Sequence, residues 1–178
     1  MRKTLLGNSK TPTSPLANSL MAALPSDLRA VMKSVTKYTD NVGNATGSVA
    51  GNVTATTDYL FLLAEFEVFG SRYYANDYER NSQLQYDYYK ASNSRVAYKH
   101  NATGTAVWWW LRSPDYNGNH YFCGVYAGDG YGRGNAYYSA ALLPGFYRYT
   151  VKWSNRKVKD DRCKRRDTSQ GETPETAL

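Results

Sequence analysis

The side chains best suited to bind a partner are concentrated between Asp115 and Tyr138. This stretch holds six of the 17 tyrosines, set among Asn, Asp, Ser and Gly. Tyrosine offers a large contact area at a low entropic cost, and Ser, Gly and Asn add adaptable hydrogen bonds, as in antibody binding loops. The residue types therefore predict a recognition surface. The alternative is that these tyrosines pack within strands, because a separate cluster from Tyr59 to Tyr98 shows that the chain also uses Tyr elsewhere.

We expect the exposed side chains of this stretch to contact a ligand. Burial of the Tyr rings would supply affinity, and Asn, Asp and Arg would set specificity. Phe122 and Val125 are expected to lie in the core instead. The candidate binding residues are Asp115, Tyr116, Asn117, Asn119, His120, Tyr126, Asp129, Tyr131, Arg133, Asn135, Tyr137 and Tyr138.

The composition of this region is also unusual at the level of codons. Between Asp115 and Val151 there is no Lys, Glu, Gln, Met, Trp or Ile. The residue types present can be reached from an Asn codon such as AAC by changing its adenines, whereas Lys, Glu, Gln, Met and Trp cannot. The pattern indicates a binding face diversified from Asn codons, most clearly over residues 115–139. An ordinary Gly-rich loop and hairpin composition is the alternative.

The chain offers little for catalysis. His100 and His120 lie in different expected turns, and neither G-x-S-x-G nor H-E-x-x-H is present. Glu65 and Glu67 are explained more simply as structural residues. We therefore expect no enzyme activity. The alternative, a carbohydrate-active or modifying enzyme, would need a pocket in which Glu65, Glu67 or His120 has a shifted pKa.

No metal or cofactor is expected either. Cys123 and Cys163 show neither CxxC nor Cys/His metal spacing, and we expect no disulfide between them. The acidic residues lack EF-hand spacing. The glycines from Gly128 to Gly134 do not form the G-x-G-x-x-G motif that binds phosphate.

Length and charge indicate one domain with two tails. The formal net charge is +7, but residues 148–178 carry nine basic and five acidic side chains, which leaves about +3 for the rest. We expect a flexible N-terminal arm over residues 1–18, a domain over 19–147 and a disordered basic tail over 148–178. The charge therefore indicates no specific nucleic-acid partner. No apolar run approaches membrane-spanning length, and Leu5 with Leu6 is too short for the apolar centre of a signal peptide.

The elements that must position the predicted surface begin with a helix. The i, i+3, i+4, i+7 set of Leu28, Val31, Met32 and Val35 predicts an amphipathic helix that starts near Pro25.

The middle of the chain has fewer regular signals. Residues 40–57 are expected to form a loop with a short strand near 49–54. Tyr59–Phe69 predicts a strand, or a strand leading into a helical turn, ended by Gly70. Tyr73–Lys90 lacks Gly and Pro and predicts one helix or two short ones.

Short strands are expected in the C-terminal half. After an extended piece at 96–99 and a turn at 101–105, Ala106–Leu111 predicts a buried strand closed by Pro114. Two further strands, at 121–126 and 135–140, should flank a turn at Asp129 and Gly130. Residues 142–146 predict a last core strand, in which Pro144 marks an edge or bulge.

WWWLRSP, residues 108–114, is the strongest structural signal. A strand places Trp109 on one face and its two Trp neighbours on the other, so at least two can be central core residues. An exposed aromatic platform is the alternative. Arg112 beside buried Trp needs a carboxylate partner, such as Glu65 or Glu67.

Three segments together resemble a known family. WWWLRSP, the upstream DYLFLLAEFEVFG and the downstream LLPGF are similar to the marks of a family of bacterial and phage domains of unknown function common in gut organisms. Those marks are a FLLSE-E-V strand, a WWLRS strand, an F-x-x-V hairpin with a DG turn, and a closing G-V-R-P-A-L strand. The resemblance covers about residues 20–147, with LPSDLRAVMKSVTKYT as the lead-in helix.

The resemblance implies an α+β, C-type-lectin-like fold with two or so helices and short, mostly antiparallel strands. That fold is shared with formylglycine-generating enzymes and with the variable target proteins of diversity-generating retroelements. In those targets the variable residues follow the Trp-rich strand, which is where residues 115–139 lie.

The departures from the family pattern limit what carries over. ALLPG at 141–145 stands where many relatives have GVRPA, and the basic tail is unlike a typical family end. Cys123 lacks the partner that formylglycine chemistry requires, and the EPN, QPD and WND motifs of animal lectins are absent. The resemblance implies a fold and a display surface, but no particular ligand.

The sequence thus predicts a ligand-binding module that presents a diversified surface. We expect it on a bacterial cell surface or a phage particle, with a protein or glycan on a cell surface as its ligand. An invariant structural or surface domain is the main alternative.

Overall fold

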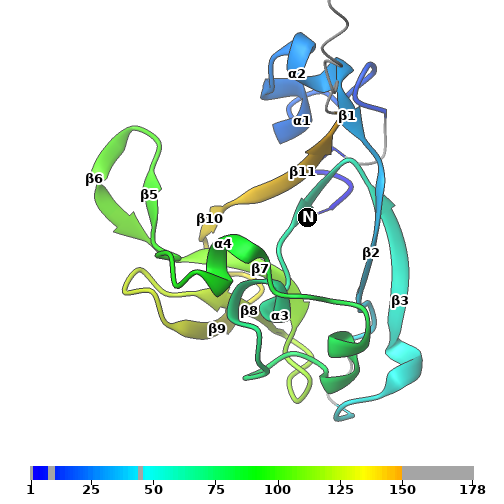
Figure 1. Cartoon of the computed structure of the whole chain (residues 1–178), viewed down its shortest axis with the longest axis vertical. Coiled ribbons are helices and arrows are strands. Elements are labelled where there is room, and N and C mark those ends of the chain that lie inside the picture. The colour runs from blue at the N-terminus through cyan, green and yellow to red at the C-terminus, as the bar shows by residue number, and fades with distance from the viewer. Residues whose placement is uncertain (1, 8–10, 44–45, 150–178) are drawn as a thin grey trace, which may run out of the picture.

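The computed structural model describes residues 2–7, 11–43 and 46–149, and the expected basic tail lies outside the described residues from position 150 onward (Figure 1). Short helices and mostly antiparallel strands make up this part of the chain, which confirms the α+β class. In chain order the elements are α1 (Leu20–Ala23), α2 (Ser26–Ala30), β1 (Met32–Lys33), β2 (Val35–Asp40), η1 (Ala50–Asn52), β3 (Val53–Asp58), β4 (Leu60–Leu62), α3 (Glu65–Phe69), η2 (Asp77–Asn81), α4 (Asp87–Lys90), β5 (Ala97–Lys99), β6 (Ala102–Val107), β7 (Trp109–Pro114), β8 (Tyr121–Val125), β9 (Tyr131–Asn135), β10 (Ala141–Leu142) and β11 (Pro144–Arg148).

The described strands form four small sheets. A four-stranded sheet has the order β10-β7-β8-β9, in which β10 runs parallel to β7 and the other pairs are antiparallel. A three-stranded sheet has the order β1-β11-β4. The hairpins β2-β3 and β5-β6 complete the set, and Figure 1 shows β5-β6 projecting away from the body while β2-β3 runs along the opposite edge.

The Trp-rich strand β7 separates two hydrophobic clusters. Trp109 is buried in a cluster with Val68, Leu111 and Val125. Trp110 is buried in a second cluster, against which Trp108 packs. The expected division of the three Trp side chains between two faces is therefore confirmed.

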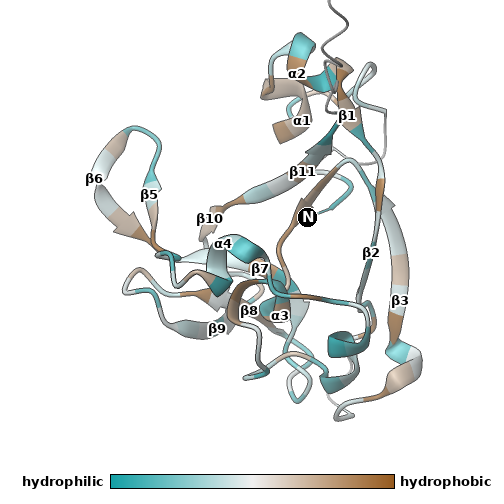
Figure 2. Cartoon of the chain, viewed as in Figure 1, coloured by the Kyte–Doolittle hydropathy of each residue, from teal (hydrophilic) through white to brown (hydrophobic). Residues whose placement is uncertain are grey.

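The run from β4 into α3 follows the second of the two expected forms, a strand leading into a helical turn. Figure 2 colours the strand after β3 as hydrophobic, and all three β4 residues are buried. Gly70 ends α3 with a φ of 71°, a left-handed conformation that favours glycine. The two short helical segments expected over Tyr73–Lys90 are η2 and α4.

The helix expected to run from Pro25 through Val35 is wrong beyond Ala30. Residues 32–33 form β1, which pairs with Tyr147 and Arg148, and β2 pairs with β3 from position 35 onward. Val35 and Thr36 are β-branched and favour strands, and their partners, Asp58 and Thr57, lie more than 20 residues further along the chain. Tertiary pairing therefore overrides the helical spacing. It also makes residues 55–57, expected as loop, part of β3, whereas the short strand expected near 49–54 is present only at residues 53 and 54, after η1.

Three other expectations in the C-terminal half require correction. Residues 102–105, expected as a turn, belong to β6. The strand after the Asp129 turn is β9, at Tyr131–Asn135 instead of 135–140, because a tight turn starts the pairing at Val125 and Tyr131. The closing strand is divided into β10 and β11, on either side of Leu143.

In the arm expected over residues 1–18, the segment around Leu5 and Leu6 packs against the domain. Leu6 is only 2% exposed and belongs to the cluster of Trp110. The N–H groups of Leu20 and Met21 donate to the carbonyls of Leu5 and Leu6. Hydrophobic burial and these backbone bonds dock this segment on α1.

Candidate functional site

The candidate surface is built on the β8-β9 hairpin, whose side chains alternate between two faces. In β9, the buried Gly132 and Gly134 alternate with the exposed Tyr131 and Arg133. Because successive residues of a strand point to opposite faces, the predicted binding residues cannot all meet on one surface. They divide between a groove on the glycine face and an aromatic cluster on the other.

The groove is an open hollow of about 680 Å³ on the glycine face. Its lining residues are Trp108, Tyr126, Ala127, Gly128, Arg133, Gly134, Tyr138 and Ser139.

Glycines allow aromatic rings to lie directly on the strands beneath this groove. A Cβ atom at Gly134 would come within 2.7 Å of Trp108 Cη2, and one at Gly132 would come within 2.6 Å of Tyr126 Cζ. A Cβ atom at Gly124 would likewise lie 3.4 Å from the Trp108 ring. Any larger residue at 132 or 134 would displace these rings. The glycines that look like loop material in the sequence therefore support the floor of the groove.

Two tyrosines of the groove combine rigidity with exposure. Tyr126 and Tyr138 are each 49% exposed. The Tyr138 ring is packed edge-to-face on Tyr137, with centroids 4.8 Å apart. Such rings present an apolar surface and a hydroxyl with few rotatable bonds, which suits recognition of a partner.

Arg133 borders the groove, and its guanidinium organises the contacts on the opposite face of the hairpin. Its guanidinium forms an ion pair with Asp115 and lies 4.8 Å from the ring centre of Tyr74 and 5.1 Å from that of Tyr121. Asp115 is 0% exposed and also accepts the N–H of Asn117. Asp115 therefore positions Arg133 from beneath and does not itself reach the surface.

Tyr131 belongs to an aromatic cluster on that same opposite face. Its ring stacks on Tyr73 with centroids 3.5 Å apart and lies edge-on to Phe69. It is still 43% exposed. Tyr131 is thus both packed and accessible, on the far side of the sheet from the groove.

The other predicted residues lie at turns and edges. Asp129, with a φ of 75°, accepts the N–H of Arg95 and so fixes the hairpin turn. Arg72 lies over the ring of Tyr116. The side chains that remain exposed at the loop ends or strand edge, outside the groove, are Asn117, Asn119, His120 and Tyr137, with Asn135 half-buried.

Of the two residues expected in the core, only Val125 is there. Val125 is fully buried, whereas Phe122 is 36% exposed. Phe122 shares the glycine face with Gly134, its cross-strand partner, and lies edge-on to Trp110. The exposed part of the Phe122 ring lines a second hollow.

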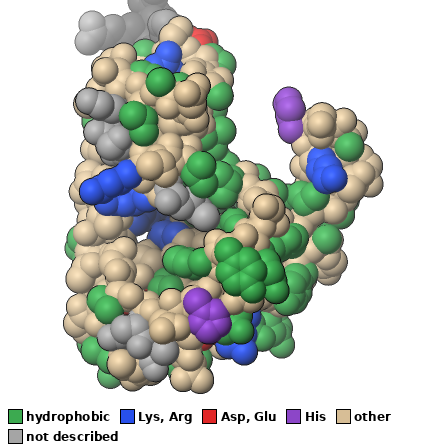
Figure 3. All heavy atoms as spheres, turned by 180° about the vertical axis from the view of Figure 1, so that it is seen from behind, with side chains coloured by type: hydrophobic (Ala, Val, Ile, Leu, Met, Phe, Trp, Pro, Cys, Tyr) green, Lys and Arg blue, Asp and Glu red, His purple; other side chains and the backbone are tan. Residues whose placement is uncertain are grey.

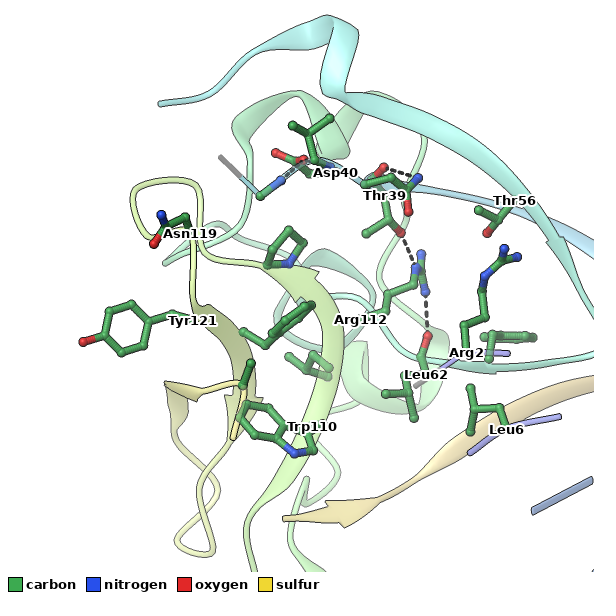
Figure 4. A pocket seen from close by; sticks show the side chains of 18 of the residues that line it. Arg2, Leu6, Thr39, Asp40, Thr56, Leu62, Trp110, Arg112, Asn119 and Tyr121 are labelled. Carbon is green, nitrogen blue, oxygen red and sulfur yellow. Dashed lines mark hydrogen bonds between the residues drawn. The ribbon is translucent and has the colours of Figure 1, made fainter. Parts of the chain in front are cut away.

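That second hollow, a pocket of about 470 Å³, was not anticipated from the sequence. It lies between the β2-β3 hairpin and strands β7 and β8, and Figure 4 shows Arg112, Trp110 and Thr39 around it. Figure 3 shows the corresponding face hollowed, with Lys or Arg side chains inside the hollow and hydrophobic side chains beside it. In the sequence, the one indication of this pocket was Arg112 within WWWLRSP. The other walls of the pocket come from segments that are distant in the sequence.

Two potentially reactive side chains, Glu67 and Cys123, are buried in the domain. Arg112 and Lys37 both form ion pairs with Glu67, which confirms the expected carboxylate partner of Arg112. Burial alone would raise the pKa of Glu67, but Arg112 and Lys37 lower it below its ordinary value. Burial raises the pKa of the Cys123 thiol well above its usual range, which keeps the thiol protonated.

The part of the chain that the structure describes contains neither a cluster of metal-ligating side chains nor a membrane-spanning helix. There, no group of three His, Cys, Asp or Glu side chains is placed to hold a metal ion. No helix among the same residues is long and apolar enough to cross a bilayer.

The fold and the hollows define the class of this chain: an α+β domain that carries an open aromatic groove and a separate pocket with a buried arginine. A comparison with family models matches residues 14–147 to a family described as Domain of unknown function (DUF6273), and the chain belongs to that family. No curated protein and no solved structure matches the chain.

Proposed function

We propose that this chain is a ligand-binding module, and that its groove binds a protein or glycan on a cell surface. The observation that carries the proposal is the pair of half-exposed rings, Tyr126 and Tyr138, beside a floor in which Trp108 rests on glycine. Preformed hollows with aromatic walls and a few polar groups are the usual form of binding sites. Because the rings are already held in place, little entropy is lost when a ligand binds.

We also propose that the domain has a C-type-lectin-like fold and is a variable protein of a diversity-generating retroelement, displayed on a bacterial cell or phage. The Asn-derived codon pattern of residues 115–139 supports this proposal. So does the arrangement of a Trp-rich strand, β7, that supports a hairpin with many exposed side chains. The competing function is an invariant structural or surface domain.

Replacing Tyr126 and Tyr138 together with Ala is expected to weaken binding strongly without unfolding the domain. Truncating an aromatic hot-spot residue costs about 2 kcal/mol or more of binding free energy, so binding should weaken at least about thirtyfold. Both rings are half exposed, so the melting temperature should change little. The measurement is binding to a glycan array and to host-cell surfaces, alongside thermal unfolding.

Tyr98→Ala is the matched control. Tyr98 is 56% exposed on the projecting β5-β6 hairpin and does not line the groove. Its replacement should leave binding unchanged. If the double variant binds as well as wild type, the groove is not the binding site. If it fails to fold, the two tyrosines act in packing and the proposal is wrong.

Sequencing the encoding locus is expected to reveal a nearby reverse transcriptase and a template repeat that differs from this gene only at adenines. Among clonal isolates, Tyr126, Tyr137 and Tyr138 should vary because their side chains are exposed. Gly132 and Gly134 should stay constant because a Cβ atom would strike an aromatic ring. Identical residues 115–139 in all isolates, without a reverse transcriptase, would favour the invariant structural domain.

A further inference from the structure

The guanidinium of Arg112 has one end that no protein group satisfies. Its Nε donates to Thr39 Oγ1 at 2.6 Å, and its Nη1 donates to the Leu62 carbonyl at 2.9 Å and to Glu67. Its Nη2 is buried and has no hydrogen-bond partner, one of two such side-chain atoms among the described residues. Leaving a buried charged donor without an acceptor is costly, so an acceptor in this position would be bound strongly.

Arg112 lines the 470 Å³ pocket between the β2-β3 hairpin and strands β7 and β8. Figure 4 shows its guanidinium and that of Arg2 directed toward the same part of this pocket. The volume falls in the range of small-molecule sites. Much of the wall is apolar, formed by Phe61, Trp110 and Phe122. The pocket therefore offers an apolar wall with a cationic end.

The carboxylates near the pocket are already engaged. Asp40 accepts the N–H groups of Val42 and Gly43 with one oxygen and the Asn76 amide with the other. Asp58 accepts from Arg2 and from the hydroxyl of Thr56. None of these contacts involves Arg112, so neither aspartate occupies its free end.

The carboxylate that pairs with Arg112 is shared with a second cation. Arg112 and Lys37, which are both largely buried, share the single carboxylate of Glu67. Glu79 is another buried carboxyl that interacts with Arg112, and burial raises its pKa. Glu67 therefore serves two cations, and an acceptor at Arg112 Nη2 would add a hydrogen bond that no protein group supplies.

We propose that this pocket binds a small organic carboxylate with an apolar body. The carboxylate accepts a hydrogen bond from Arg112 Nη2, and Arg2, which is ion-paired with Asp58, lies in the same pocket wall. The body of the ligand lies against Phe61, Trp110 and Phe122. This site differs from the aromatic groove, with which it shares no lining residue.

The test compares acids with their uncharged and cationic analogues on the full-length protein. The probes are 3-phenylpropionate and octanoate, each with the matching primary amide and primary amine. Binding is measured by calorimetry and by the change in Trp emission, since Trp110 lines the pocket. Each acid should bind at least about tenfold more tightly than its amide, as a charge-assisted hydrogen bond contributes that much, and the amines should not bind.

Two variants locate the binding. Arg112→Lys keeps the positive charge near Glu67 but removes Nη2, so the preference for acid over amide should disappear. Ala136 is exposed and lines the pocket, so the larger side chain of Ala136→Trp should block both acids and amides. Tyr126→Ala, a variant of the groove, should leave acid binding unchanged.

The wild-type comparison decides the matter even if Arg112→Lys does not fold. Equal binding of acid and amide would show that only the apolar wall attracts ligands and would overturn the proposal. So would an absence of binding by every acid, or acid binding that survives Ala136→Trp. Acid binding that is lost only in Tyr126→Ala would place it in the groove and also overturn the proposal.

Discussion

Glu67→Ala is expected to destabilise the domain by about 3–5 kcal/mol, because removing one partner of a buried ion pair leaves the other charge uncompensated. Glu67 accepts from Lys37 at 2.9 Å and from Arg112, and it also accepts the N–H of Ala64 at the start of α3. Its loss would leave two buried cations without an anion. Urea unfolding, monitored by Trp emission, measures the difference.

Asp87→Ala is the matched control for this loss of charge. Asp87 forms an ion pair with Lys90, but both side chains are highly exposed. An exposed pair of this kind contributes about 0–1 kcal/mol. A cost for Glu67→Ala no greater than that for Asp87→Ala would mean that the buried cluster does not stabilise the fold.

The stabilisation by Glu67 should also depend on pH in a definite direction. The pKa of Glu67 in the folded state is lowered from the ordinary value of 4.5, so its ionisation stabilises the fold above the unfolded-state pKa. That contribution is lost as the pH falls through the folded-state pKa. Burial raises the pKa of Glu79, so its contribution has the opposite sign and is lost as the pH rises. Comparing wild type with Glu67→Ala isolates the first effect, and the gap between them should narrow below about pH 4.5.

The sequence predicted those features that depend on local composition. The alternation of Trp109 with its neighbours placed them on two faces of β7. Gly70 ended α3 because its φ of 71° suits glycine. The need of a charged group for a buried partner linked Arg112 to Glu67. Each inference used only residues within one segment or a single strong physical requirement.

The sequence could not predict features that depend on distant pairing. The helical spacing around Val31 gave way to strands because residues 147 and 148 supply the partner of β1. The candidate binding residues were treated as one surface, but strand alternation separates Tyr126 from Tyr131. The pocket beside Arg112 has walls from β2, β3, β7 and β8. No single segment of the sequence contains the residues that line this pocket, so no local pattern could predict it.

Glu65→Ala is expected to cost about 3 kcal/mol or more, because each backbone N–H left without an acceptor in a buried setting costs about 1–3 kcal/mol. Glu65 is almost fully buried, and its carboxylate accepts the N–H groups of Tyr73, Tyr74 and Ala75 at 2.8–3.0 Å. Glu65→Gln keeps the shape but only one accepting oxygen, so it should have an intermediate effect. Equal stability of all three proteins in urea unfolding would contradict this role.

The same variants also distinguish the two faces of the hairpin. Glu65 holds the loop in which Tyr73 stacks on Tyr131 and Tyr74 lies beside Arg133. Its replacement should loosen that face, which near-ultraviolet circular dichroism of the tyrosines would report. The groove lies on the other face and has no residue from this loop. Well below the melting temperature, Glu65→Gln should therefore bind the groove ligand as wild type does, whereas a loss of binding would assign recognition to the face of Tyr131.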